Sequence, residues 1–150
     1  MPLTDLMAAV STQVLPAADR DTLLHTAAGL LACQQAGADE LFASLREREQ
    51  LGSTAIGHGI AIPHGRAPDL DAPRGALLRL HQPIDFDGQG TQVDLIFAMA
   101  VPAHYTHQHL MLLSELAEQF SIEEFRDALR NAPDAAALYA LLGGAPRAAA

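Results

Sequence analysis

Apolar residues recur at helical spacing in the first third of the chain, each time behind an acidic residue that can begin a helix. The first set follows Asp19 and consists of Leu23, Ala27, Leu30, Leu31 and Gln34. Gly37 provides a stop, because glycine commonly follows the last turn of a helix. The second set follows Asp39 and consists of Leu41, Phe42 and Leu45. The spacing therefore predicts two consecutive helices, one between Asp19 and Gly37 and one after Asp39.

Two unbroken apolar runs in the middle of the chain differ from this helical pattern. Residues 76–78 form the first run, which leads to Leu80, and residues 95–101 form a longer one. Pro83 and Pro102 close them, and short apolar runs with such boundaries are typical of strands that are covered on both faces. Residues 60–62, Ile-Ala-Ile, are a shorter strand candidate.

Helical spacing returns near the C-terminus. Thr106 can cap a helix whose predicted buried stripe consists of Leu110, Leu113, Leu116, Ala117 and Phe120. Residues 121–124, Ser-Ile-Glu-Glu, form a capping box that opens the next helix. Asp134 begins a last helix, which Gly143 ends.

Helices that alternate with buried strands predict an α/β fold, with a mixed β-sheet and helices on both faces. The chain has 150 residues, of which 49% are apolar, and this length and composition fit a single domain. We expect the domain to comprise residues 1–143, with residues 144–150 as a disordered tail.

The charge of the chain limits the classes of molecule that the protein is expected to bind. The net charge is -9, and all nine basic residues are arginines scattered along the sequence. Because nucleic-acid binding normally needs a concentrated basic surface, we expect no nucleic-acid partner. The absence of lysine also excludes a P-loop lysine and Schiff-base chemistry.

The termini and the single cysteine indicate the compartment. No stretch is long and apolar enough to span a bilayer, and Asp5 stands where a signal peptide needs basic residues. We therefore expect no membrane insertion and a cytoplasmic location. Cys33 alone excludes an internal disulfide and a cysteine-based metal site, and its place on an apolar helix predicts that it is packed.

The most unusual segment for chemistry is residues 48–66. Three glycines within eight residues, Gly52, Gly57 and Gly59, predict a loop whose backbone N–H groups can approach an anion. A short apolar strand follows and leads to His64, which lies between a proline and a glycine. The pattern indicates a rigidly held histidine that solvent can reach, and a tight turn with a surface histidine is the alternative.

A second group of histidines surrounds the predicted helix start at Thr106. His109 falls on the first helical turn, where the helix dipole disfavours an imidazolium and favours bound anions. A neutral histidine N–H at this place can donate a hydrogen bond to a phosphoryl group. Solvated surface histidines are one alternative, and a zinc site on His104 and His107 is another, although it lacks the H-E-x-x-H pattern and cysteine partners.

Two motifs carry a resemblance to a known family. Residues 52–66, Gly-Ser-Thr-Ala-Ile-Gly-His-Gly-Ile-Ala-Ile-Pro-His-Gly-Arg, resemble the active-site signature of the fructose/mannitol-type (type-2) enzyme IIA domains of the bacterial phosphotransferase system. Val101-Pro102 and the positions of Thr106, His109, Leu110, Leu113, Leu116 and Ala117 look like that family's second motif. The similarity runs from about Leu6 to Leu142, and the chain looks most like the nitrogen-regulatory branch.

The resemblance implies a mixed sheet between helices and a role for four residues. His64 would be the phosphoryl acceptor, through its Nε2 atom, with an HPr-like phosphocarrier protein as donor. His109 and Arg48 would support the transfer, and Ser53 would lie in the loop beside the phosphate. The resemblance assigns no catalytic role to His58 or Arg66, and it requires no metal and no cofactor.

Three functions follow as hypotheses. The first is a regulatory histidine phosphotransferase whose phosphohistidine state controls target proteins, which the resemblance places in potassium transport and among sensor kinases. The second is a sugar-specific enzyme IIA that relays phosphate to an enzyme IIB, and the third is a metal-dependent hydrolase built on the histidine cluster. A homodimer is also open, because Leu6 and Met7 would suit either a dimer face or the core.

Overall fold

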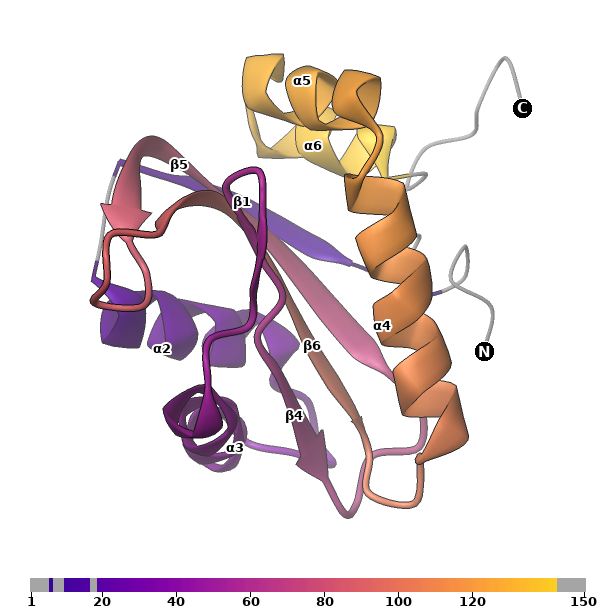
Figure 1. Ribbon diagram of the computed structural model, residues 1–150. Coiled ribbons are helices and arrows are strands. Elements are labelled where there is room, and N and C mark those ends of the chain that lie inside the picture. The colour runs from indigo at the N-terminus through magenta and orange to yellow at the C-terminus, as the bar shows by residue number, and fades with distance from the viewer. Residues whose placement is uncertain (1–5, 7–9, 17–18, 143–150) are drawn as a thin grey trace.

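The computed structural model describes residues 6, 10–16 and 19–142, and among these the centre is a six-stranded mixed sheet (Figure 1). The strands are β1 (Ser11–Leu15), β2 (Ala55–Gly57), β3 (Ile60–Ala61), β4 (His64–Ala67), β5 (Arg74–Asp85) and β6 (Gln92–Pro102). The sheet order is β1-β5-β6-β3-β2, and β4 also pairs with β6. β5 and β6 are antiparallel, whereas β1 pairs in parallel with β5, and β3 and β4 pair in parallel with β6.

Helices cover both faces of this sheet, which confirms the predicted α/β fold (Figure 1). The helices α2 (Arg20–Leu31) and α3 (Ala38–Leu51) lie on one face. The opposite face carries α4 (His107–Phe120), α5 (Glu123–Asn131) and α6 (Ala135–Leu141). In the part of the chain that the structure describes, no helix is long and apolar enough to cross a membrane.

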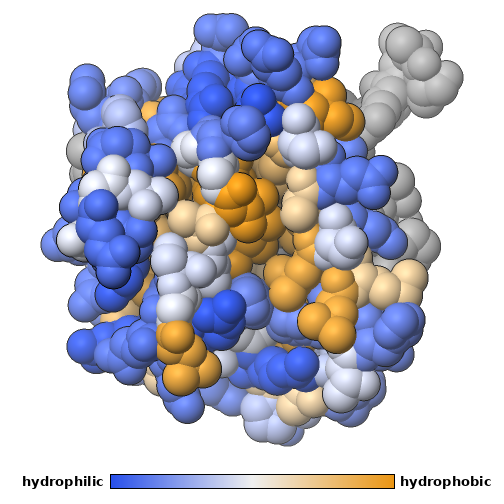
Figure 2. Space-filling model, in the orientation of Figure 1, coloured by the Kyte–Doolittle hydropathy of each residue, from blue (hydrophilic) through white to orange (hydrophobic). Residues whose placement is uncertain are grey.

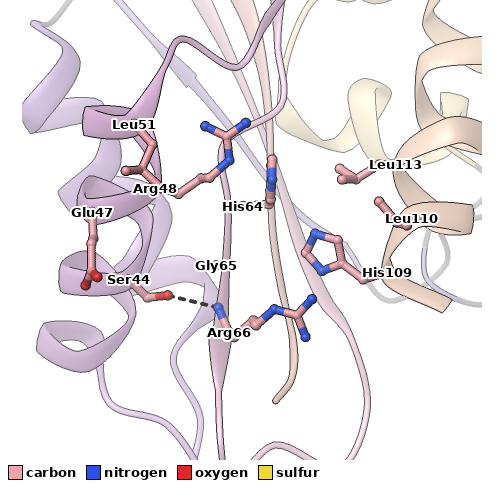
Figure 3. A pocket seen from close by; sticks show the side chains of 10 residues that line it. All are labelled: Ser44, Glu47, Arg48, Leu51, His64, Gly65, Arg66, His109, Leu110 and Leu113. Carbon is pink, nitrogen blue, oxygen red and sulfur yellow. Dashed lines mark hydrogen bonds between the residues drawn. The ribbon is translucent and has the colours of Figure 1, made fainter. Parts of the chain in front are cut away.

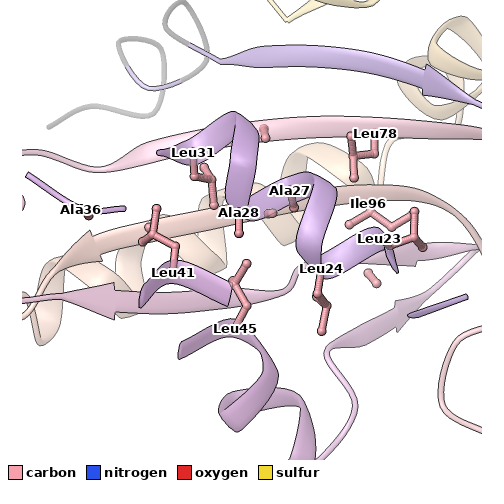
Figure 4. Packing of buried hydrophobic residues seen from close by; sticks show 14 of the residues in the cluster. Leu23, Leu24, Ala27, Ala28, Leu31, Ala36, Leu41, Leu45, Leu78 and Ile96 are labelled. Atoms are coloured by element: carbon pink, nitrogen blue, oxygen red, sulfur yellow. The ribbon is translucent and has the colours of Figure 1, made fainter. Parts of the chain in front are cut away.

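Each face has its own apolar core. On the first face, leucines and alanines of α2 and α3 pack on Leu78 and Ile96 of the sheet (Figure 4). On the second face, Phe120 of α4 packs beside Phe97 of β6, with ring centroids 6.1 Å apart. Leu6 is fully buried in this second core, so its apolar side chain serves the fold of its own chain, while Met7 lies outside the described residues.

The first two helices differ from the prediction at their boundary. Asp19 caps α2 as expected, and its carboxylate accepts a hydrogen bond from the Thr22 N–H at 2.7 Å. The helix ends at Leu31 instead of continuing through Gln34, because the backbones of Cys33 and Ala36 pair with each other in a turn. Gly37 is therefore the N-cap of α3 and not the stop of α2. Cys33 itself is half-buried and packs against the first core.

The strand predictions hold for the two long runs, with one wrong boundary. Pro102 ends β6 as expected, but β5 continues through Pro83 to Asp85. The pairing of β5 with β6 is irregular between Arg79 and Ile84, and a proline is tolerated at such a place because no ladder hydrogen bond needs its missing N–H.

Two details of the C-terminal helices were predicted wrongly. Leu110 is 65% exposed, and the buried side of α4 consists of His109, Leu112, Leu116 and Phe120. Ser121 caps the end of α4, where its hydroxyl donates to the Glu118 carbonyl, so it forms no capping box for α5. Asp134 caps α6 as predicted, whereas Gly143 and the tail at 144–150 lie outside the described residues.

Candidate active site

His64 is the first residue of β4 and lies opposite Met99 of the neighbouring strand β6. The Met99 N–H donates to the Pro63 carbonyl at 2.9 Å, which fixes the backbone immediately before the histidine. The half-buried ring of His64 lines two adjoining cavities, of about 560 and 360 Å³. The larger cavity opens between α3 and the start of α4 (Figure 3).

The hydrogen bonding of the His64 ring defines its free nitrogen. Nδ1 lies 2.8 Å from the Ile62 carbonyl oxygen, and because a carbonyl only accepts, Nδ1 carries the proton and donates it. In the neutral ring Nε2 then holds an unshared electron pair. Burial lowers the pKa of His64, and the charges of Arg48 and Arg66 lower it further against the opposing effect of the Ile62 hydrogen bond. The site therefore favours the neutral, nucleophilic form.

His109 is the third residue of α4, and its ring lies beside that of His64. The two ring centroids are 5.1 Å apart and the ring planes are inclined by 64°. His109 is only 6% exposed. Burial lowers its pKa to about 4, and the positive charges of Arg66, Arg48 and, when it is protonated, His64 act in the same direction. Its ring is therefore neutral at pH 7.

Arg48 and Ser53 approach the site from the other side. Arg48 lies in the last turn of α3, lines both cavities and donates to the Gly52 carbonyl at 2.8 Å. Ser53 lines only the smaller cavity, and its hydroxyl accepts the Ala55 N–H at 3.1 Å. The structure thus brings His64, His109 and Arg48 around one cavity and leaves Ser53 next to it.

Three contacts at the site were not foreseen from the sequence. The Arg66 side chain lines the larger cavity and donates to the carbonyls of Ala103 and Tyr105. Its signal was the two-residue spacing from His64, because alternate residues of a strand share a face. That signal is visible only if residues 64–67 are recognised as a strand.

The second contact explains why residue 65 is a glycine. A Cβ atom at this position would lie 2.6 Å from the Ser44 hydroxyl and 3.3 Å from the Leu45 nitrogen. The glycine therefore allows α3 to approach β4 closely. Ser44 also accepts the Arg66 backbone N–H at 2.9 Å, so the two elements are joined beside the catalytic candidate.

The third contact is a buried carboxyl group at the end of α3. Glu49 is 3% exposed and accepts hydrogen bonds from both the backbone N–H and the hydroxyl of Thr54. Burial raises the pKa of Glu49 against the effect of these hydrogen bonds. The pair fastens the 52–54 loop to the helix that carries Arg48, and nothing in its charged sequence surroundings marks Glu49 as buried.

The other two histidines of the second group lie apart from the cavities. The His104 ring contacts Tyr105 edge-on, with centroids 5.2 Å apart, and His107 begins α4. Within the described residues no group of three or more histidines, cysteines, aspartates or glutamates is arranged to hold a metal ion.

The sequence and the α/β fold together identify the chain as a component of a phosphotransferase system. The sequence model of the family described as "Phosphoenolpyruvate-dependent sugar phosphotransferase system, EIIA 2" matches residues 8–144, and the chain belongs to this family. The match confirms the resemblance carried by residues 52–66 and by the second motif.

Individual relatives show which members of the family the chain resembles. The chain is 40% identical over 131 residues to the nitrogen regulatory protein of Pseudomonas aeruginosa, and the match covers 85% of each chain. The crystal structure of the nitrogen regulatory protein IIA-Ntr from Neisseria meningitidis has a TM-score of 0.82 at 33% identity, over 93% of this chain and 98% of that one. Enzyme IIAMtl of Escherichia coli, solved in complex with phosphorylated enzyme IIBMtl, has a TM-score of 0.72 at 17% identity, over 89% of this chain and 95% of that one, and shares the fold.

Proposed function

We propose that this protein is a regulatory phosphocarrier that accepts a phosphoryl group on Nε2 of His64 from an HPr-like phosphocarrier protein. The observation that carries the proposal is the hydrogen bond from Nδ1 of His64 to the Ile62 carbonyl. It occupies the proton-bearing nitrogen and directs the reactivity of the ring to Nε2. An imidazole attacks phosphorus only through an unprotonated nitrogen, so this tautomer and the lowered pKa of His64 both favour acceptance.

The transfer itself balances without an added proton. The Nε2 electron pair of His64 forms a bond to phosphorus while the bond from phosphorus to the donor's histidine nitrogen breaks, and the electrons of that bond remain on the donor ring. The proton on Nδ1 of His64 stays in its hydrogen bond to Ile62. Since phosphoryl transfer passes through a loose state with charge on the equatorial oxygens, positioning and electrostatics account for most of the catalysis.

Arg48 and His109 are the groups that we assign to this electrostatic task. The Arg48 guanidinium borders both cavities next to His64, and its fixed charge can stabilise the transferring phosphoryl oxygens. The neutral His109 ring can donate one N–H from the opposite side. Ser53 lies in the adjoining loop and lines the smaller cavity, so we place it beside the phosphoryl group and give it no role as a nucleophile.

The surface around the site suits a small protein donor. Figure 2 shows apolar side chains gathered between α3 and α4, surrounded by hydrophilic residues. Leu51 is 82% exposed and Leu110 is 65% exposed, and both line the larger cavity. An apolar centre with a polar rim is the common form of a protein interface, and the net charge of -9 favours a donor with a basic rim.

The regulatory branch is supported by relatives named nitrogen regulatory protein. We propose a cytoplasmic protein whose targets belong to potassium transport or to the sensor kinases that the resemblance implies. The alternative is a sugar-specific enzyme IIA, and the observation in its favour is the shared fold with the mannitol enzyme that was solved with its phosphorylated enzyme IIB. Transfer from His64 to a sugar-specific enzyme IIB would distinguish the two functions.

The test of the phosphocarrier is the His64→Ala protein incubated with a phosphorylated HPr-like donor. We expect the wild type to gain an acid-labile, alkali-stable phosphoryl group and the variant to gain none. His107→Ala is the matched control, because His107 lies outside both cavities, and it should be labelled fully. Full labelling of a folded His64→Ala protein would refute the assignment.

A further inference from the structure

The buried ring nitrogen of His109 has no hydrogen-bond partner. Among the described residues, Nδ1 of His109 is the only buried side-chain nitrogen or oxygen atom without a hydrogen-bond partner. Nε2 of the same ring also makes no hydrogen bond, but it is not a buried atom. Nε2 is therefore the nitrogen that reaches the cavity lined by His64. A neutral ring carries its proton on one of these two atoms, and the choice decides whether it can donate into the cavity.

The surroundings of His109 favour the proton on Nε2. With the proton on Nδ1, a buried donor would have no acceptor, which native structures generally avoid. With the proton on Nε2, the buried Nδ1 presents an unshared electron pair, and a nearby positive charge stabilises that pair. A guanidinium supplies such a charge together with N–H donors, and it offers no acceptor for an Nδ1 proton.

Arg66 is the cation that meets this description. In Figure 3 the His109 ring lies between His64 and the Arg66 guanidinium, on the wall of one cavity. Nη1 of Arg66 donates to the carbonyls of Ala103 and Tyr105, which lie in the loop immediately before α4. The backbone N–H of Arg66 is held by the Ser44 hydroxyl at 2.9 Å. The guanidinium is therefore fastened to the loop that leads into the helix carrying His109.

The geometry points to Arg66 as a positioning residue for phosphoryl transfer, which holds the neutral His109 ring in the tautomer with its proton on Nε2. In that tautomer His109 can donate to the phosphoryl group on His64, so the inference rests on the proposed function. Arg48 also faces the cavity, but its guanidinium is bonded to the Gly52 carbonyl at the end of α3. The two arginines thus have separate tasks, Arg48 toward the phosphoryl group and Arg66 toward the His109 ring.

Long-range ¹⁵N–¹H correlation spectroscopy of the imidazole rings tests the inference in the unphosphorylated protein. We expect the wild type to show His109 with the proton on Nε2 and an unprotonated Nδ1. In Arg66→Gln the positive charge is lost and the amide oxygen offers Nδ1 an acceptor, so the Nδ1–H form should become populated. Arg66→Lys retains the charge and should retain the Nε2–H form. Arg46→Gln is the matched control, because Arg46 is exposed on α3 and lines neither cavity.

Rates of phosphoryl transfer from the donor carrier complete the test. We expect Arg66→Gln to transfer at least about tenfold more slowly, as when one transition-state hydrogen bond is lost, and Arg66→Lys to recover most of the rate. A wild-type ring with the proton on Nδ1 would overturn the inference. A slow Arg66→Gln protein with an unchanged tautomer would also overturn it, because Arg66 would then contact the phosphoryl group directly. The tautomer is measured without any donor, so failure of His64 as acceptor would be recognised separately.

Discussion

The ring centroids of His64 and His109 lie 5.1 Å apart. The protein keeps both rings neutral but gives them different hydrogen-bonding roles. Burial is the largest cause that lowers the pKa of each ring. Their partners differ, because Nδ1 of His64 donates to a carbonyl oxygen and Nδ1 of His109 has no hydrogen-bond partner. One ring can therefore present an electron pair to the cavity and the other an N–H.

The roles proposed for His109 and Arg48 lead to a prediction for the rate of phosphoryl transfer. Arg48→Ala and His109→Ala should slow phosphoryl uptake by about 10- to 1,000-fold, because each removes one group that stabilises the transition state. Both proteins should still be modified on His64, since neither change removes the acceptor. Rapid-quench measurement with a phosphorylated donor carrier gives the rates, and His104→Ala serves as a control that should be nearly silent. Wild-type rates in both variants would show that Arg48 and His109 are structural or solvated residues without a role in the transfer.

The burial of His109 also predicts how stability depends on pH. Its pKa is about 4 in the folded protein and near 6.5 when unfolded, so between these values the unfolded chain binds more protons. The free energy of unfolding should therefore rise with pH across this window, and the contribution of His109 should be lost as the pH falls from 7 to 4. The shift corresponds to roughly 3 kcal/mol.

Urea unfolding of wild type and His109→Gln at pH 7 and pH 4 measures this contribution. Carboxyl groups also titrate in this range, so the informative quantity is the difference between the two proteins. We expect the wild type to lose more stability than the variant. His107→Gln, at the exposed start of the same helix, should follow the wild type. Equal losses in wild type and His109→Gln would contradict the buried, neutral state of His109.

At the scale of elements, the sequence predicts those whose pattern is local. The run at 95–101 is apolar throughout, and all of its residues are buried in strand β6. Asp19 and Asp134 cap α2 and α6 as expected. β1 has no apolar run, and all five of its residues are half-buried. It is a strand because it pairs with β5, some sixty residues away, and such pairing leaves no mark in the local sequence.

The site was predictable to the same extent. His64, His109 and Ser53 were predicted from the two motifs, and Arg48 was predicted from the family resemblance. The structure places all four beside adjoining cavities. The contacts of Arg66 with Ala103 and Tyr105 bridge nearly forty residues of sequence, so no local pattern predicts them. Leu110 fits the helical spacing and yet is exposed, because α4 turns His109 inward at the site and leaves Leu110 outside.

The close approach of α3 to β4 gives a prediction at this scale. Gly65→Ala should destabilise the protein by about 1–3 kcal/mol, because the new methyl group would meet the Ser44 hydroxyl and the Leu45 backbone. Phosphoryl uptake should also fall, since the same contact positions His64. Gly29→Ala in α2 is the matched control, because no atom lies within 4 Å of its Cβ position. The control should be neutral or stabilising by up to about 1 kcal/mol. Equal unfolding free energies for wild type and Gly65→Ala would show that the neighbouring helix yields without strain.

For the whole molecule, the proposed phosphorylation would change the charge of one defined surface. The chain carries a net charge of -9, and a phosphoryl group on His64 would add roughly two further negative charges. The exposed leucines Leu51 and Leu110 border the same cavity, so a partner that covers them also meets the phosphoryl group. An acidic partner would be repelled by the modified surface and an arginine-bearing partner attracted to it.

We therefore predict that the unphosphorylated and phosphorylated forms differ in affinity for a regulated target by about 1–3 kcal/mol, a common size for such coupling. Affinity capture from a cell lysate of the source bacterium, with His64→Ala beside phosphorylated wild type, should recover different sets of proteins. Calorimetry with each recovered target then gives the difference in affinity. A carrier that only relays phosphate needs no such difference. Identical protein sets, together with rapid transfer to a sugar-specific enzyme IIB, would overturn the regulatory function in favour of the transport one.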